Sequence, residues 1–79
     1  MNLIESHPAK FKDRVFEVRV YDRGSDYFVS GYEGGEIKTW SYTVGRNDTM
    51  AQSMIGRKKP YVALVDVVKA NIKAGIVLA

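Results

Sequence analysis

Residues 27–44, YFVSGYEGGEIKTWSYTV, decide the fold because they hold two alternating apolar segments on either side of a glycine pair. Such a pair is typical of a two-residue hairpin loop, since the favoured hairpin turns need positive φ. With Gly34 and Gly35 at the tip, counting outward along both segments gives the register of the hairpin. The predicted cross-strand pairs are Tyr32–Ile37, Gly31–Lys38, Ser30–Thr39, Val29–Trp40, Phe28–Ser41 and Tyr27–Tyr42.

A third alternating segment precedes this hairpin. Residues 14–22 place β-branched and aromatic side chains at period two, which is typical of a half-buried strand. Residues 22–26 supply Asp, Gly and Ser, which favour a turn, so the chain reverses before residue 27. The segments 14–22, 27–32 and 37–44 are therefore predicted to form three antiparallel strands, followed by turn residues at 45–48.

The last third of the chain predicts a helix from about Pro60 to Ala74. Proline suits the first turn, and Gly75 suits the left-handed position after the last one. At about 100° per residue, one side of this helix is apolar, with Tyr61, Leu64, Val65, Val68 and Ile72. Thr49–Gln52 reads as a capping box, and Gly56 could close one or two helical turns that begin there.

The two ends of the chain carry weaker signals. Residues 1–12 include Pro8, which disfavours a helical conformation at the residue before it, so we expect an extended or irregular segment that is able to move. The apolar tail, residues 76–79, is expected either to add an edge strand or to dock against the core. The 79 residues suffice for a single small domain. The predicted fold class is α+β: a three-stranded antiparallel β-meander with a C-terminal helix packed on one face.

The register assigns the strand residues to two faces. One face is the predicted core, with the helix over it and Gly31 letting the helix backbone come close. Its side chains are Phe16, Val18, Val20, Tyr27, Val29, Trp40 and Tyr42. The opposite face carries Val15, Glu17, Arg19, Tyr21, Phe28, Ser30, Tyr32, Ile37, Thr39 and Ser41.

This opposite face is more apolar than a solvated sheet face, because Tyr21, Phe28, Tyr32 and Ile37 all point from it. The first explanation is that Leu3, Ile4 and Phe11 of the N-terminal segment, or the C-terminal tail, fold across it. The second is that a protein partner or a second copy covers it, and the third is that nucleic-acid bases stack on the aromatic rings. Under the second explanation, the predicted partner-binding residues are Arg19, Tyr21, Phe28, Tyr32 and Ile37.

A basic run supports a different hypothesis, direct binding of nucleic acid. The chain has 12 Lys and Arg against 9 Asp and Glu, a formal charge of +3, which is informative only where the cations cluster. Arg57, Lys58 and Lys59 stand together before the helix, and Arg46 could join them, with Lys69 and Lys73 nearby. A phosphate group could use both these charges and the helix N-terminus.

Signatures of catalysis are absent from the sequence. There is no cysteine, and His7 is the one histidine, so we expect neither a conventional metal site nor a thiolate nucleophile, and we expect His7 at the surface. The carboxylate pairs Asp22/Asp26 and Glu33/Glu36 fall at turns, where Glu remains in water. Chains this small rarely build a ligand pocket of about 300 Å³. We therefore expect no enzyme and no cofactor.

The remaining features favour a cytoplasmic binding protein. No basic leader precedes an apolar stretch, and no apolar run approaches the roughly 18 residues of a membrane span, so we expect no membrane partner. In size and layout the chain resembles accessory proteins and inhibitors of phages and mobile elements, anti-CRISPR proteins among them. That resemblance implies a non-catalytic protein that docks onto a protein partner or forms a homodimer, with nucleic-acid binding as the alternative.

Overall fold

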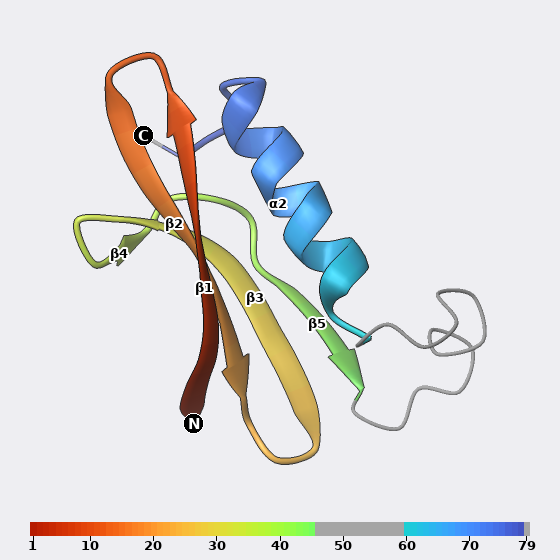
Figure 1. Ribbon diagram of the computed structural model, residues 1–79. Helices are drawn as coiled ribbons and strands as arrows, with labels where there is room; N and C mark the ends of the chain where they lie inside the picture. The colour runs from red at the N-terminus through yellow and green to blue at the C-terminus, as the bar shows by residue number, and fades with distance from the viewer. Residues whose placement is uncertain (46–59, 79) are drawn as a thin grey trace.

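The computed structural model describes residues 1–45 and 60–78, which form an antiparallel sheet with one helix against it (Figure 1). The elements are β1 (Asn2–Phe11), β2 (Arg14–Asp22), β3 (Asp26–Glu33), β4 (Glu36–Ile37), β5 (Tyr42–Gly45) and α2 (Val62–Lys73). The α+β class is as predicted, but the described sheet has five strands instead of three. The predicted turns over 49–56 lie outside the described residues.

The N-terminal segment provides the first additional strand. β1 pairs with β2 from Asn2 to Phe11, and Phe11 lies opposite Arg14, so Lys12 and Asp13 form a two-residue hairpin loop. Lys12 has a φ of 56°, which the tight reversal requires. β1 lies at one edge of the sheet, and Pro8 stands inside it. The segment is thus extended, one of the two expected conformations, and it pairs with β2 except for a register shift between Leu3 and Glu5.

The second additional strand arises because the predicted segment 37–44 divides in two. Near the glycine turn the register is as predicted, with Tyr32 opposite Ile37. Further along, Val29 lies opposite Tyr42 and not opposite Trp40, a shift of two residues. The predicted pairs Ser30–Thr39, Val29–Trp40, Phe28–Ser41 and Tyr27–Tyr42 are therefore wrong, whereas the Lys38 N–H donates to the carbonyl of Gly31 at 2.9 Å, as the predicted pair requires. Residues 38–41 connect β4 to β5 without belonging to either strand.

Thr39 accounts for the break. The backbone N–H of Gly31 donates to the Thr39 hydroxyl at 2.7 Å, and that hydroxyl donates to the carbonyl of Trp40 at 3.0 Å. A side chain thus replaces the strand acceptor that Gly31 would otherwise use. A Cβ at Gly31 would lie 2.6 Å from Thr39 Cγ2 and 3.2 Å from Ile72 Cδ1. Gly31 therefore makes room for two side chains and not, as predicted, for the helix backbone.

The core lies between the sheet and α2, on the face that the sequence predicts. Its buried apolar side chains are Ala9, Phe16, Val18, Val20, Tyr27, Val29, Tyr61, Val65, Val68 and Ile72. Tyr42 packs against this core because a two-residue shift leaves the alternation of faces unchanged. The prediction for Trp40 is wrong, since its side chain is 59% exposed, and Thr39 is 1% exposed on the helix side instead of lying on the opposite face.

α2 ends at the predicted glycine. Gly75 has a φ of 76°, its N–H donates to the carbonyl of Ile72, and the N–H of Ile76 donates to the carbonyl of Asn71. These two bonds form a Schellman motif, which satisfies carbonyls that the helix leaves free. After it the tail docks, because the Leu78 N–H donates to the carbonyl of Lys38 and Val77 packs against the core.

Candidate docking surface

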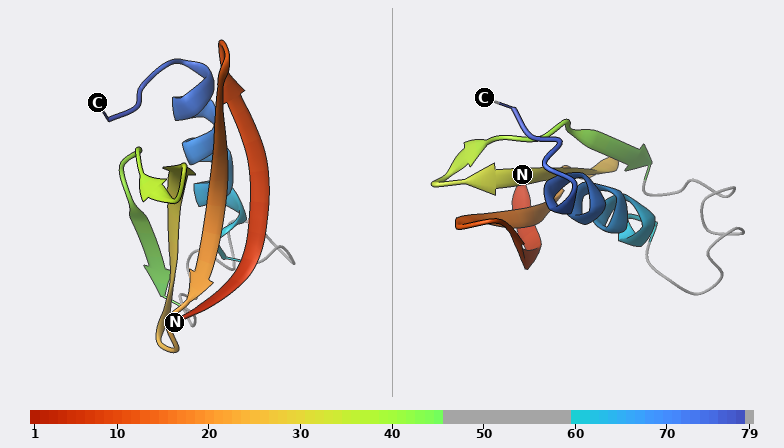
Figure 2. Two further views of the ribbon diagram at one scale, coloured as in Figure 1. Left: turned by 90° about the vertical axis from the view of Figure 1, so that its left-hand side faces the viewer. Right: turned by 90° about the horizontal axis from the view of Figure 1, so that it is seen from above.

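The face of the sheet turned away from α2, called the outer face below, has no described helix or strand over it. The left view of Figure 2 looks onto this face, with α2 behind the strands. Its members are Leu3, Ser6, Pro8, Lys10, Val15, Glu17, Arg19, Tyr21, Phe28, Ser30, Tyr32, Ile37 and Thr43. β1 extends the sheet sideways, and its Phe11 packs against the core. The N-terminal segment therefore does not fold across the outer face, contrary to the first explanation.

The predicted partner-binding residues lie together on the outer face. Tyr21 is half-buried, and its ring centroid lies 6.5 Å from that of Phe28 and 6.1 Å from that of Tyr32. Ile37 lies opposite Tyr32 and is 43% exposed, and Val15, at the other end of the face, is 59% exposed. The aromatic and aliphatic side chains thus form one apolar surface that remains partly open to water.

Arg19 lies over this surface and covers one of its rings. Its guanidinium sits 4.5 Å from the centroid of the Tyr32 ring, which leaves Tyr32 only 8% exposed. Arg19 Nε donates to the Glu17 carboxylate, and Nη1 donates to the Tyr21 hydroxyl at 3.2 Å. The bond from Arg19 lowers the pKa of Glu17, whereas burial raises the pKa of Tyr32. Sequence reasoning missed the role of Glu17, although opposite charges two residues apart on one strand share a face.

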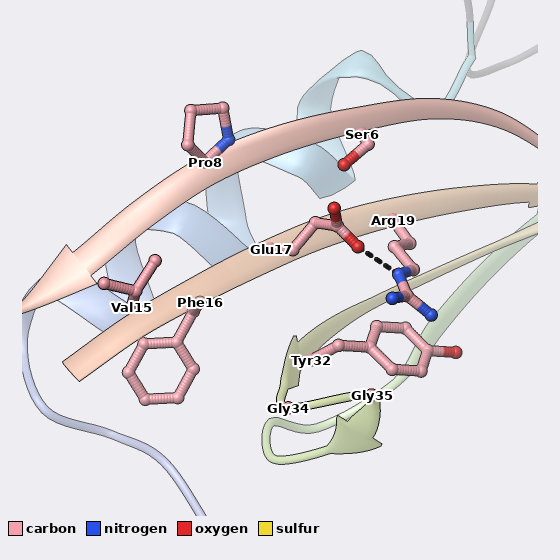
Figure 3. Close-up of a pocket in the computed structure, with 9 residues that line it drawn as sticks. All are labelled: Ser6, Pro8, Val15, Phe16, Glu17, Arg19, Tyr32, Gly34 and Gly35. Carbon is pink, nitrogen blue, oxygen red and sulfur yellow. Dashed lines mark hydrogen bonds and ion pairs between the residues drawn. The ribbon is translucent and has the colours of Figure 1, made fainter.

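A shallow hollow of about 330 Å³ adjoins the Glu17–Arg19 pair (Figure 3). It is lined by Ser6, Pro8, Val15, Phe16, Glu17, Arg19, Tyr32, Gly34 and Gly35. Its volume reaches the size that the sequence analysis did not expect, but it is a broad depression and not an enclosed cavity. The two charged side chains that line the hollow, Glu17 and Arg19, are hydrogen-bonded to each other. Each therefore holds the other in position beside the hollow.

Two further arginines have carboxylate partners with two hydrogen bonds each. Arg23 binds Asp26 at 2.7 and 2.6 Å at the β2–β3 turn, and its guanidinium lies 5.3 Å from the centroid of the Phe28 ring. Arg14 binds Glu33 at 2.9 and 2.7 Å. These bonds lower the pKa values of Asp26 and Glu33. The turn carboxylates Asp26 and Glu33 are thus ion-paired, so the expectation that Glu33 remains in water is wrong.

We expect stability to fall in acid, and Glu33 to contribute to that fall. Because its folded pKa is below its usual value of 4.5, Glu33 stabilises the fold above that pH, and this contribution is lost as pH drops through the folded pKa. Thermal unfolding between about pH 7 and pH 3 measures the effect. Glu33→Gln should flatten the acid limb, whereas Glu36→Gln, which changes a carboxylate 76% exposed, should leave it nearly unchanged. Equal acid limbs in all three proteins would contradict the prediction.

A second polar cluster lies under the beginning of α2. His7 Nε2 is 2.9 Å from Glu5 Oε1, and the Tyr61 hydroxyl donates to the other oxygen of the same carboxylate. Burial raises the pKa of Tyr61, and the bond to Glu5 acts in the same direction. His7 is half-buried, where the sequence analysis expected a surface residue. Over residues 1–45 and 60–78, no three His, Cys, Asp or Glu side chains are grouped as metal ligands would be.

The residues of the nucleic-acid hypothesis are not placed by the structure. Arg46, Arg57, Lys58 and Lys59 all lie outside the described residues. Lys69 and Lys73 are described and belong to α2, on the opposite side of the sheet from the outer face.

Comparisons with known proteins return no relative: no family model, no curated protein and no solved structure matches the chain.

The described helix, α2, has 12 residues, and the described part of the chain contains no helix with the length and apolar character needed to cross a membrane.

Proposed function

We propose that the protein is a small non-catalytic binding protein that docks onto a protein partner through its outer face. The observation that carries this proposal is the partly open apolar surface of Val15, Tyr21, Phe28 and Ile37, on the side of the sheet that α2, the described helix, does not cover. A sheet is normally buried on its apolar face, and a large exposed apolar patch marks an interaction site. In this respect the protein would act as small accessory proteins and inhibitors do, by occupying a surface of its partner.

The charges of the outer face favour a protein over a nucleic acid. Arg19 and Arg23 each have a carboxylate partner, so a phosphate group that approaches either arginine would meet repulsion from Glu17 or Asp26. The ring of Tyr32 is also covered by Arg19 and offers no open face for a stacked base. A protein surface with apolar side chains needs neither of these changes, because it contacts Phe28 and Ile37 directly.

The breadth of the hollow supports the same choice. Sites for small molecules bury most of their ligand, whereas protein interfaces are wide and nearly flat. The hollow beside Arg19 is a broad depression bordered by Val15 and Pro8, a shape that accepts one protruding side chain of a larger partner.

A site-specific cross-linking experiment tests the proposal. A photoreactive benzoyl-phenylalanine is placed at position 15 or 28 of the full chain, or at position 66 on the exposed side of α2 as control. Irradiation in the cells that produce the protein should give protein adducts from positions 15 and 28 and not from position 66. Adding Phe28→Asp should abolish the adduct from position 15. Absence of adducts, or equal adducts from position 66, would overturn the proposal.

A further inference from the structure

An ion pair occupies the middle of the outer face, where an apolar side chain would be usual. β2 lies between β1 and β3, and Glu17 and Arg19 fall near the centre of this strand. Glu17 lies opposite Pro8 on one side and opposite Tyr32 on the other. Any partner that covers the face must therefore provide charged or polar groups at this point, because burying a charge without a partner costs several kcal/mol.

Both members of the pair keep unused hydrogen-bonding capacity. The bonds to Glu17 and Tyr21 use two of the five N–H donors of the Arg19 guanidinium. The stacking on Tyr32 holds the guanidinium over the sheet, beside the hollow (Figure 3). Glu17 is 43% exposed at its side chain, so its carboxylate can accept further bonds from outside. The pair thus offers donors and acceptors side by side.

Such a pair is its own electrostatic complement. A two-fold rotation about an axis between the two side chains brings the Arg19 guanidinium of one copy over the Glu17 carboxylate of the other. The four groups then alternate in sign around the axis, and each charge gains a second partner as it leaves water. A partner with an excess of one charge would instead meet repulsion from Arg19 or from Glu17.

The size of the outer face agrees with a weak dimer. The nine residues of β2 span about 30 Å at ~3.3 Å per residue, and four strand columns at ~4.8 Å span about 19 Å, a footprint of about 570 Å². A standard interface buries about 800 Å² on each partner, and weak complexes fall below about 600 Å². Two sheets packed face to face also leave α2 of each copy on the outside, so the described helix does not obstruct the contact.

We infer that the partner is a second copy of the chain, packed outer face against outer face with the two Glu17–Arg19 pairs meeting at a two-fold axis. This inference rests on the proposed docking function of the outer face and names the occupant. The dimer has four layers, helix, sheet, sheet and helix, and its apolar rim consists of Val15, Phe28 and Ile37 from both copies.

A charge exchange tests the dimer. Sedimentation velocity between about 10 µM and 1 mM should show the wild-type protein changing from monomer to dimer. Glu17→Arg gives two positive side chains at the axis, and Arg19→Glu gives two negative ones, so each variant alone should dimerise at least about tenfold more weakly. An equimolar mixture of the two variants should recover the wild-type association, because each supplies the charge that the other lacks.

Matched controls separate the interface from net charge and from folding. Asp66→Arg and Lys73→Glu make the same changes in net charge on exposed positions of α2, and both should dimerise as the wild type does. Circular dichroism checks that each variant is folded. Should one of the Glu17 or Arg19 variants unfold, Val15→Asp, which changes a side chain 59% exposed, should weaken the dimer in its place.

Specific results would overturn the inference: a wild-type monomer at 1 mM, variants that dimerise like the wild type, or a mixture that does not recover association. The cross-linking experiment distinguishes this failure from failure of the docking function. Adducts from position 28 at twice the mass of the chain support the dimer. Adducts to a different protein alone would overturn the dimer and leave the docking function intact. If neither kind of adduct forms, both the dimer and the docking function are overturned.

Discussion

Gly31→Ala is expected to destabilise the protein by about 2–3 kcal/mol, although alanine is normally the better residue inside a strand. The new Cβ would lie 2.6 Å from Thr39 Cγ2, and this side chain cannot turn away without losing two hydrogen bonds. The overlap therefore outweighs the gain of roughly 0.5–1 kcal/mol that alanine offers through the unfolded chain. Denaturant unfolding should show a lower midpoint at an unchanged slope.

Thr39→Ser supplies the matched background for this measurement. Serine keeps the hydroxyl that binds Gly31 and removes the methyl group that meets the new Cβ. In this background Gly31→Ala should cost less than half as much as in the wild type, because the closest overlap has gone. An equal cost in both backgrounds, or a gain in stability from Gly31→Ala, would show that the packing of Thr39 is not the cause.

Gly75→Ala is expected to cost about 2–4 kcal/mol, for two reasons that act together. Gly75 has a φ of 76°, which a residue with a Cβ adopts only at a cost, and the new methyl group would lie 2.8 Å from Cζ of the Phe11 ring. The end of α2 and the beginning of the tail would both move, since Gly75 also donates to the carbonyl of Ile72. Thermal and denaturant unfolding measure the loss.

Gly34→Ala is the control that isolates the contact with Phe11. Gly34 has a φ of 60°, but a Cβ there would meet nothing within 4 Å, so alanine should cost only the backbone contribution of about 1–2 kcal/mol. In a Phe11→Leu background, which removes the end of the ring, Gly75→Ala should approach this smaller value. If Gly75→Ala and Gly34→Ala cost the same, the contact with the ring has no energetic weight.

These two glycines also show which parts of the fold a sequence can predict. The hairpin at Gly34 and the end of α2 at Gly75 depend on positive φ, a local requirement that few residues other than glycine meet. Both were predictable, and the pairing of Tyr32 with Ile37 next to the turn followed from the first. Local backbone rules determine these features before any packing is considered.

The position of Trp40 was not predictable by the same means, because it depends on a tertiary contact. The alternation of residues 37–44 continues through Thr39 without a visible break, but the Gly31 N–H donates to the Thr39 hydroxyl and the Lys38 carbonyl accepts from Leu78, so contacts that alternation does not specify interrupt the pairing. Since the interruption shifts the register by two residues, the assignment of Tyr42 and Phe28 to their faces was unaffected. A shift of one residue would have exchanged the faces.

The strand at the N-terminus escaped prediction for a related reason. On its helix-facing side it carries Glu5 and His7, and polar residues at these positions conceal the alternation. Glu5 is tolerated on this side because Tyr61, which directly precedes α2, donates a hydrogen bond to its carboxylate from 56 residues away in sequence. The aromatic part of the outer face was predictable from alternation alone. The bond between Glu17 and Arg19 was not, because alternation places both charges on one face without specifying the partner that each side chain takes.

The proline in β1 limits how copies of the chain can join. Counted from the hydrogen-bonded closing pair Phe11–Arg14 of the hairpin, Pro8 falls in a pair that exchanges no hydrogen bonds with β2, so its ring nitrogen points outward and carries no hydrogen. A strand that paired with the outer edge of β1 would find no N–H donor at Pro8 and could not form an unbroken ladder of hydrogen bonds. Pro8 therefore disfavours extension of the sheet by strand addition along β1.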